Sequence, residues 1–141
     1  MVKIPVQKVT PDAKLPTYAH SGDAAMDLYA NEATTIAAGE RVRVPTGVKF
    51  AIPHGLVGLV WDKSGLAINK MLKTLGGVID AGYRGEVIVG IVNLSAEEVR
   101  IERGDKIAQM IIQERVAGEI VEATALDETA RGVNGFGSTG R

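Results

Sequence analysis

Short apolar segments separated by glycine and proline run along the whole chain. Most of these segments are rich in valine and isoleucine, a composition typical of β-strands rather than of helices. We therefore predict an all-β fold. The expected strands cover residues 3–6, 25–29, 41–44, 48–51, 56–61, 77–80, 86–93, 99–101 and 106–114.

Three segments carry a more specific pattern. Arg41 to Val44 alternates charged and apolar residues, which predicts a strand with one wet face and one buried face. Residues 86–92 are apolar apart from Glu86, which predicts a strand covered on both faces. Residues 65–73 have apolar positions three and four apart behind Ser64, a candidate N-cap. They predict one short helix within a β-barrel or jelly roll.

The composition excludes several classes of protein. The chain has 141 residues, enough for one domain, with 16 basic and 17 acidic residues. This near-neutral balance gives no general attraction for a nucleic acid polymer or an anionic membrane, so neither is an expected partner. The absence of cysteine excludes disulfides, thiol catalysis and cysteine-ligated metal sites. No apolar run is long enough to cross a bilayer, and we expect a soluble, intracellular protein of the cytoplasm.

The last eleven residues, 131–141, form a glycine-rich tail with two arginines, one aromatic ring and two hydroxyl side chains. Glycines allow close backbone approach, arginine matches phosphate oxygens and a phenylalanine offers a face for a base. A nucleotide is the ligand that uses all three. The alternative is a disordered terminus. Residues 116–123, which precede the tail, could pair with a sheet edge, possibly on another subunit.

Two aspartates are candidate functional carboxylates. Asp27 lies within an apolar strand, where an unpaired charge is costly, so it requires a cation or several donors nearby; a salt bridge to an arginine is the simplest explanation. Asp80 closes the strand before Ala81–Gly82 and residues 83–86, which predicts a β-hairpin with a carboxylate at its mouth. An aspartate is also common in ordinary turns.

Two further segments are suited to anion binding. Lys63, Ser64 and Gly65 lead from a strand into the predicted helix, where a serine and backbone amides can bind an anion, although a simple N-cap explains them too. Gln109 is a polar residue in an apolar strand, and a cross-strand hydrogen bond would account for it. His20 and His54 lack metal-ligand spacing. Any metal chemistry would therefore use carboxylate and phosphate oxygens, which favours Mg²⁺.

Together these segments resemble the trimeric deoxyuridine triphosphate nucleotidohydrolase (dUTPase) family. The resemblance runs from Pro16 to Gly140 and includes five motifs in order. These motifs are matched by residues 24–28 (AAMDL), 63–66 (KSGL), 77–85 (GVIDAGYRG), 104–109 (GDKIAQ) and the tail, 131–140.

The resemblance implies a distorted jelly-roll β-barrel over residues 1–130 and a flexible tail, 131–141, that closes the active site in a homotrimer. It implies hydrolysis of dUTP to dUMP and pyrophosphate with Mg²⁺. By the match, Asp80 would activate the water that attacks the α-phosphorus, and Asp27 would hold hydrated Mg²⁺ through water. Backbone groups between Gly77 and Ile88 would read uracil.

The resemblance also implies which residues contact the substrate. Tyr83 would pack against the deoxyribose, Phe136 would stack on uracil, and Gln109 with Arg131 would hold phosphates. The full expected set is Lys63, Ser64, Gly65, Thr74, Gly77, Val78, Ile79, Asp80, Tyr83, Ile88, Gln109, Arg131, Phe136, Gly137 and Ser138.

The chain departs from the family pattern at several positions. Lys63 and Lys106 occupy positions where arginine is usual, Thr74 one where asparagine is usual, and Ala25–Met26 replaces glycine-tyrosine. Lysine lacks the planar fork of arginine, so Lys63 could alter phosphate affinity. Two other functions remain open: dCTP deamination, with Glu86 as a poorly placed base, and a binding or regulatory module that does not turn dUTP over.

Overall fold

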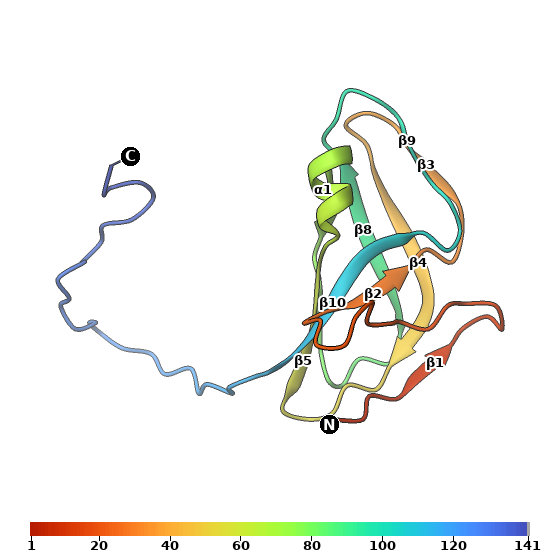
Figure 1. The fold of residues 1–141 in the computed structure, drawn as a ribbon. Coiled ribbons are helices and arrows are strands. Elements are labelled where there is room, and N and C mark those ends of the chain that lie inside the picture. The colour runs from red at the N-terminus through yellow and green to blue at the C-terminus, as the bar shows by residue number, and fades with distance from the viewer. Residues whose placement is uncertain (141) are drawn as a thin grey trace.

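The computed structural model describes residues 1–140, and its body consists of antiparallel strands with one short helix (Figure 1). The strands form two four-stranded sheets, in the orders β1-β4-β8-β6 and β2-β10-β5-β7, and a β3-β9 pair. The elements are β1 (Val6–Lys8), β2 (Met26–Tyr29), β3 (Thr34–Ile36), β4 (Arg41–Phe50), β5 (Leu56–Asp62), α1 (Ser64–Lys70), β6 (Leu72–Leu75), β7 (Val78–Ile79), β8 (Glu86–Asn93), β9 (Val99–Ile101) and β10 (Lys106–Glu114). The all-β expectation is confirmed.

The core between the two large sheets is aliphatic. Side chains with almost no exposure include Leu28, Ile36, Ile91, Ile101 and Met110. Burial of their apolar surface is the main driving force for folding. Phe50 is the one aromatic side chain among the buried core residues of the described chain, as expected for a sequence with 4% aromatic residues.

Strand boundaries agree with the sequence pattern where strands are long. The strands expected over 86–93, 99–101 and 106–114 have those bounds in the structure. The strands expected over 41–44 and 48–51 are instead one strand, β4, because its register with β8 shifts between Pro45 and Lys49 without ending the strand. The first strand begins at Val6 rather than at residue 3, and β3 and β6 were not expected.

The helix differs from its expected form at both ends. It spans Ser64–Lys70 and ends because Met71 adopts a left-handed conformation with φ 55°, which a continuing helix cannot contain. Residues 72–75 then form β6 rather than a further helical turn. The N-cap is Lys63, with no side-chain capping hydrogen bond, so the prediction that Ser64 caps the helix is wrong.

The hairpin expected around Asp80 is also wrong. β7 pairs with β5, whereas β8 pairs with β4 and β6, so β7 and β8 belong to different sheets. The intervening residues therefore cross from one sheet to the other. We call residues 77–88 the crossover segment.

Strand β8 alternates between buried and half-buried residues. The prediction that both of its faces are covered is therefore wrong for the single chain, in which one face packs on the core. The wet and buried faces predicted for Arg41 to Val44 are confirmed, since Arg41 and Arg43 are exposed and Val44 is buried.

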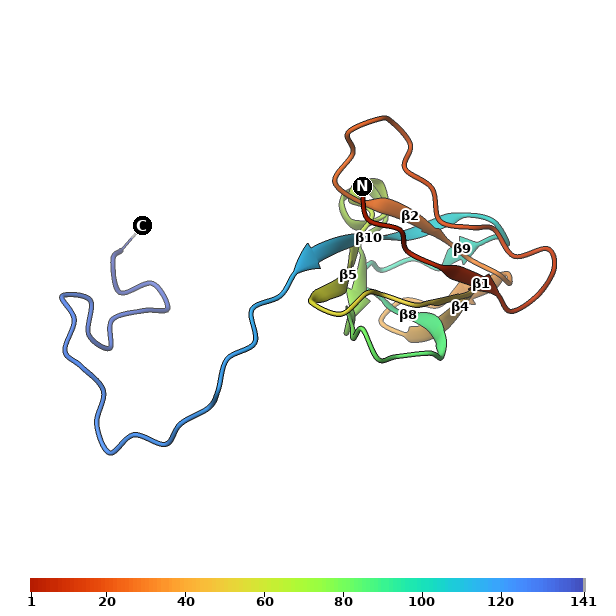
Figure 2. The same cartoon turned by 90° about the horizontal axis from the view of Figure 1, so that it is seen from below.

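Beyond β10 the chain leaves the body and extends away from it (Figures 1 and 2). Residues 115–140 contain no strand or helix and are almost entirely exposed. The hydrogen bonds given for residues 129–140 all join residues of that same stretch. In the described chain, no helix is both long and apolar enough to cross a membrane.

Candidate active site

The sheet ordered β2-β10-β5-β7 carries most of the candidate residues of the body. Asp27 on β2 is opposite Gln109 on β10, and Gln109 is opposite Trp61 on β5. On the other side of β5, Leu59 is opposite Val78 of β7. Neighbouring strands lie about 4.8 Å apart, so the antiparallel pairing brings together residues that are distant in sequence.

Asp27 lies between two lysines. Its carboxylate is buried, with 4% side-chain exposure; Oδ1 lies 2.6 Å from Lys63 Nζ and Oδ2 lies 2.7 Å from Lys106 Nζ. The salt bridge expected for this residue is therefore present, with lysines rather than an arginine as partners. These lysines occupy two of the positions at which the chain departs from the family pattern.

The two ammonium groups keep Asp27 ionised. Burial would raise the pKa of its carboxyl, but Lys106 and Lys63 outweigh burial and hold the pKa below its ordinary value of 3.8. Oδ2 has the Lys106 ammonium at 2.7 Å as its partner in the described chain, and each oxygen of a carboxylate has a second lone pair. An ionised carboxylate with a remaining acceptor position fits a water molecule of a hydrated Mg²⁺ ion.

The described residues contain no cluster of three or more carboxylate, histidine or cysteine side chains that could hold a metal alone. Mg²⁺ at Asp27 would therefore need further oxygen ligands from water and substrate phosphates.

The turn formed by Lys63, Ser64 and Gly65 follows the end of β5. Ser64 and Gly65 are exposed, and a Cβ added to Gly65 would meet no atom within 4 Å. Within residues 1–140, the Ser64 hydroxyl has no hydrogen-bond partner. The turn is thus open to a ligand.

Asp62 connects this turn with Gln109 and Thr74. The Gln109 side-chain amide donates to the Asp62 carbonyl oxygen at 2.8 Å, which is the cross-strand bond considered above. Oδ1 of Asp62 accepts two hydrogen bonds of 2.7 Å, from the Thr74 amide and hydroxyl. The sequence reasoning missed Asp62, although its place directly before a recognised motif was a usable signal.

Asp80 lies in a second part of the site. A hollow of about 240 Å³ is bordered by Val78, Ile79, Asp80, Tyr83 and Ile88, together with Arg43, Glu86 and Val87. Asp80 is exposed, and no ion pair or side-chain hydrogen bond is found for its carboxylate within the described chain. Its surroundings differ from those of Asp27, which is buried and doubly paired.

Two further charged residues lie beside this hollow: Arg43, which was not assigned a role from the sequence, and Glu86, which was considered only as a deaminase base. Arg43 lies on the wet face of β4 and forms no ion pair with another residue of the described chain. Glu86 accepts a 2.7 Å hydrogen bond from the Gly47 amide. This bond secures the crossover segment to the irregular part of β4, and it engages one oxygen of the carboxylate that a deaminase mechanism would use as its base.

Tyr83 and Gly77 are held by local contacts. The Tyr83 hydroxyl donates to the Glu86 carbonyl oxygen at 3.0 Å. Gly77 has φ 125°, and an added Cβ would lie 2.7 Å from the Val60 carbonyl oxygen. Gly77 also accepts a 2.8 Å hydrogen bond from the Val60 amide. The crossover segment therefore begins with a backbone conformation and a close approach that only glycine permits.

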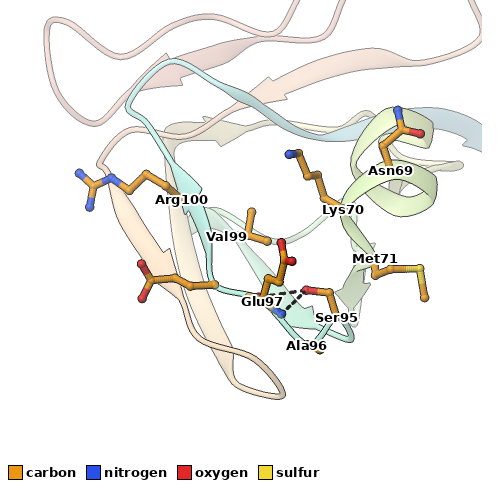
Figure 3. Close-up of a pocket in the computed structure, with 9 residues that line it drawn as sticks. Asn69, Lys70, Met71, Ser95, Ala96, Glu97, Val99 and Arg100 are labelled. Atoms are coloured by element: carbon orange, nitrogen blue, oxygen red, sulfur yellow. Dashed lines mark hydrogen bonds between the residues drawn. The ribbon is translucent and has the colours of Figure 1, made fainter.

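A larger hollow elsewhere contains none of the expected site residues. It has a volume of about 530 Å³ and lies between the end of α1 and the segment that joins β8 to β9 (Figure 3). Its lining includes Lys70, Arg100, Glu97 and Glu98, and Ser95 forms hydrogen bonds with Glu97 across its wall. These charges have mixed sign and select no single ligand.

The tail residues are not brought to the site within one chain. Arg131, Phe136, Gly137 and Ser138 are exposed and lie on the extended segment away from the body (Figure 2). Arg131 donates only to the Asn134 carbonyl oxygen, at 3.0 Å. The single chain thus provides a lysine-paired carboxylate, an open turn and a hollow with a free carboxylate, but not the closing segment.

Comparisons of the sequence and of the structure with known proteins all identify the same family. The family model described as dUTPase matches residues 11–140. The deoxyuridine 5'-triphosphate nucleotidohydrolase of Mycolicibacterium gilvum is 46% identical over 143 residues, covering 96% of this chain and 93% of that relative. The enzyme of the same name from Corynebacterium diphtheriae is 44% identical over 140 residues, covering 97% and 92%.

Solved structures agree with the sequence relatives. A mutant dUTPase of Staphylococcus bacteriophage 80alpha with bound dUpNHpp is similar with a TM-score of 0.93, at 26% identity and full coverage of both chains. A mutant dUTPase of phage phi11 of S. aureus, described with a structural Mg(II) ion, has a TM-score of 0.82 at 25% identity, covering 88% of this chain and 98% of that one.

Proposed function

This chain belongs to the dUTPase family and hydrolyses dUTP to dUMP and pyrophosphate, and we propose that Asp80 and Asp27 divide the chemistry between them. The observation that carries the proposal is the contrast between the two carboxylates. Asp27 is buried between two ammonium groups, whereas Asp80 is exposed and unpaired beside a hollow within the described chain.

Asp80 acts as the general base. A base must reach the water that it activates, and its acceptor oxygens must be free of other strong partners. Two observations support this role: Asp80 borders the hollow with Tyr83 and Ile88, and no cation is paired with it in residues 1–140. It orients and deprotonates the water that attacks the α-phosphorus.

Asp27 holds hydrated Mg²⁺ through water. Lys63 and Lys106 keep its carboxyl ionised, and each oxygen has a second lone pair that can accept from a metal-bound water. Bound Mg²⁺ supplies charge neutralisation at the phosphate oxygens. The related phage enzyme described with a structural Mg(II) ion supports this choice of metal.

The triphosphate contacts the open turn and β10. Ser64 and Gly65 donate to phosphate oxygens, and Gln109 and Arg131 hold the remainder. Lys63 contributes positive charge near the turn while its ammonium remains paired with Asp27 at 2.6 Å. Thr74 is a weaker candidate for direct contact, because its hydroxyl donates to Asp62.

The crossover segment reads the nucleoside. Fixed amides and carbonyls between Gly77 and Ile88, including those of Val78 and Ile79, match the edge of uracil and mismatch that of cytosine. Tyr83 packs against the deoxyribose, where a 2′-hydroxyl would clash. Glu86 supports this arrangement because it holds the segment to Gly47.

The active enzyme is a homotrimer in which the tail, residues 131–141, closes a site formed with neighbouring chains. Within residues 1–140 of one chain, the segment after β10 extends away from the body, which leaves it free to reach a site on a second copy. Phe136 stacks on uracil, and Gly137 and Ser138 contact the phosphates. Residues 1–130 serve as the structural domain.

The experiment that tests this proposal measures pyrophosphate release by purified protein with Mg²⁺ from dUTP, UTP, dCTP and dTTP, with ammonia followed in the same samples. Turnover of dUTP alone is expected. Ammonia from dCTP would replace the proposal with deamination. Saturable dUTP binding without turnover would indicate a regulatory module, and Lys63→Arg would then be the first variant to make.

A further inference from the structure

Asp62 occupies a structurally central place at the end of β5. It is half-buried, and it directly precedes the turn formed by Lys63 and Ser64. We propose that Asp62 is a positioning residue: by tying the end of β5 to β6 and β10, it fixes where Ser64 and Gln109 present their donors to the triphosphate. This inference rests on the proposed assignment of Ser64 and Gln109 to phosphate binding.

The side chain of Asp62 holds β6. Its Oδ1 accepts hydrogen bonds of 2.7 Å from both the amide and the hydroxyl of Thr74, and its Oδ2 accepts one of 2.8 Å from Lys73 Nζ. All three donors come from two consecutive residues of β6. A single carboxylate thus joins the ends of two strands that belong to different sheets.

The backbone of Asp62 holds Gln109, which lies on β10. Its carbonyl oxygen accepts the Gln109 side-chain amide at 2.8 Å, and Asp62 is opposite Ala108 in the pairing of β5 with β10. The orientation of the Gln109 amide therefore depends on where the Asp62 peptide lies. Movement of the end of β5 would displace Ser64 and Gln109 together.

The turn has little anchoring of its own. Its N-cap residue, Lys63, makes no side-chain capping bond, and α1 has seven residues with none buried. A short helix with no side-chain cap and no fully buried residue is weakly held. Besides Asp62, the contacts that restrain the turn are the ion pair of Lys63 with Asp27 and the packing of Leu66 against the core.

The charge of Asp62 is compatible with phosphate nearby. Lys73 neutralises it across 2.8 Å, which limits repulsion of the substrate. Burial opposes ionisation of Asp62, but hydrogen bonds from Lys73 and Thr74 outweigh burial and lower its pKa below 3.8. Lys73 has 51% side-chain exposure, so its ion pair alone contributes little to stability. The bonds to Thr74 carry most of the positional restraint.

The test measures binding of two probes to the intact protein with Mg²⁺, dUpNHpp and deoxyuridine, alongside steady-state hydrolysis of dUTP. In Asp62→Ala, dUpNHpp binding is expected to weaken and the KM for dUTP to rise, each by roughly ten- to hundredfold, because misplacement by about 1 Å has costs of this size. Deoxyuridine binding should change by less than about threefold, since the nucleoside makes no phosphate contact. A loss of folded protein would instead lower kcat and leave KM unchanged.

Two further variants separate the parts of the network. Asp62→Asn keeps an acceptor oxygen for Thr74 and should recover most of the dUpNHpp affinity. Thr74→Val removes the hydroxyl donor to Asp62. The double variant Asp62→Ala/Thr74→Val should lose less dUpNHpp affinity than the sum of the losses in the two single variants, because both changes break the same contact. Glu102→Gln, which breaks the exposed ion pair with Arg100, is the matched control and should alter neither probe.

Equal weakening of dUpNHpp and deoxyuridine would overturn the proposal, as would unchanged binding of dUpNHpp in Asp62→Ala. Asp62→Asn and Thr74→Val keep the test decisive if the alanine variant does not fold. Failure of this proposal is distinguishable from failure of the proposed function: in the first case the unmodified enzyme still hydrolyses dUTP, and in the second case it does not.

Discussion

Lys63 Nζ lies 2.6 Å from Oδ1 of Asp27, so a lysine at a position where the family usually has arginine is already paired with a carboxylate of the same site. Lys106 Nζ lies 2.7 Å from the other oxygen. Two departures from the family pattern therefore meet at one buried group. Both lysines therefore neutralise the same carboxylate.

Removing one lysine should destabilise the fold. In Lys63→Met, Asp27 keeps only Lys106, and we expect the free energy of unfolding to fall by about 1–3 kcal/mol, less than the loss of all partners of a buried charge. Urea unfolding measures this. Lys63→Arg is the control and should retain the stability. Unchanged stability in Lys63→Met would show that Asp27 does not depend on this pair.

Asp80→Asn should abolish most catalysis while sparing binding. The amide cannot accept a proton from water, so kcat should fall on the order of a hundredfold or more, with dUpNHpp still bound. Pyrophosphate release and calorimetric binding measure the two effects. Glu98→Gln, an exposed carboxylate outside the site, is the control. Near-normal turnover in Asp80→Asn would remove Asp80 from the mechanism.

Acid should weaken the fold partly through Asp62. Its folded-state pKa lies below the ordinary value of 3.8, so the unfolded chain binds more protons in this range and stability rises with pH. The contribution of Asp62 is complete well above pH 3.8 and is lost as pH falls through 3.8 toward the folded-state pKa. Unfolding measured between about pH 5 and 2 should depend less on pH in Asp62→Asn. An identical slope would contradict the role of its partners.

Two neighbouring glycines provide a matched test of the crossover segment. Gly76→Ala should cost about 1 kcal/mol, because φ is 74° but the added Cβ would meet no atom within 4 Å. Gly77→Ala should cost about 2–4 kcal/mol, because its φ is 125° and the Cβ would lie 2.7 Å from the Val60 carbonyl oxygen. Thermal or urea unfolding measures the loss of stability in each variant. Equal losses would show that the backbone at residue 77 moves enough to relieve the clash with Val60.

Deleting residues 131–141 should leave a folded protein with little activity. Within the described chain, this segment contributes no residue to the core, and Phe136 and Arg131 are exposed. We expect an unchanged unfolding midpoint and a loss of kcat/KM on the order of a hundredfold, the scale expected when substrate-positioning contacts are lost. Phe136→Ala should produce a smaller loss of the same kind. Unfolding of the truncated protein would contradict the function of the tail as a lid.

The sequence pattern was most informative where a segment's own residues decide its structure. Long valine- and isoleucine-rich segments gave correct bounds for β8, β9 and β10, because their β propensity and burial agree. The motif residues also identified the family, since five matched segments occur in order. The helix was predicted to continue to residue 73, but it ends at Lys70, because nothing in the local sequence indicates the left-handed conformation of Met71.

Pairing across the chain required the tertiary structure. The sequence pattern predicted a hairpin around Asp80, but β7 pairs with β5 because β8 is already held by β4 and β6. The ion pairs of Asp27 also required the tertiary structure. Asp27 was recognised as needing a cation, yet Lys63 and Lys106 are 36 and 79 positions away in sequence and meet it only through strand packing.

By itself, the sequence determined the all-β class, the aliphatic core and the set of groups available for phosphate chemistry, because composition and local spacing fix these. Only the tertiary structure decided which carboxylate is paired and which is free, and it showed that Asp62 joins Thr74 to Gln109. These relationships depend on strand order and register. Strand order and register result from long-range packing and leave no local pattern in the sequence.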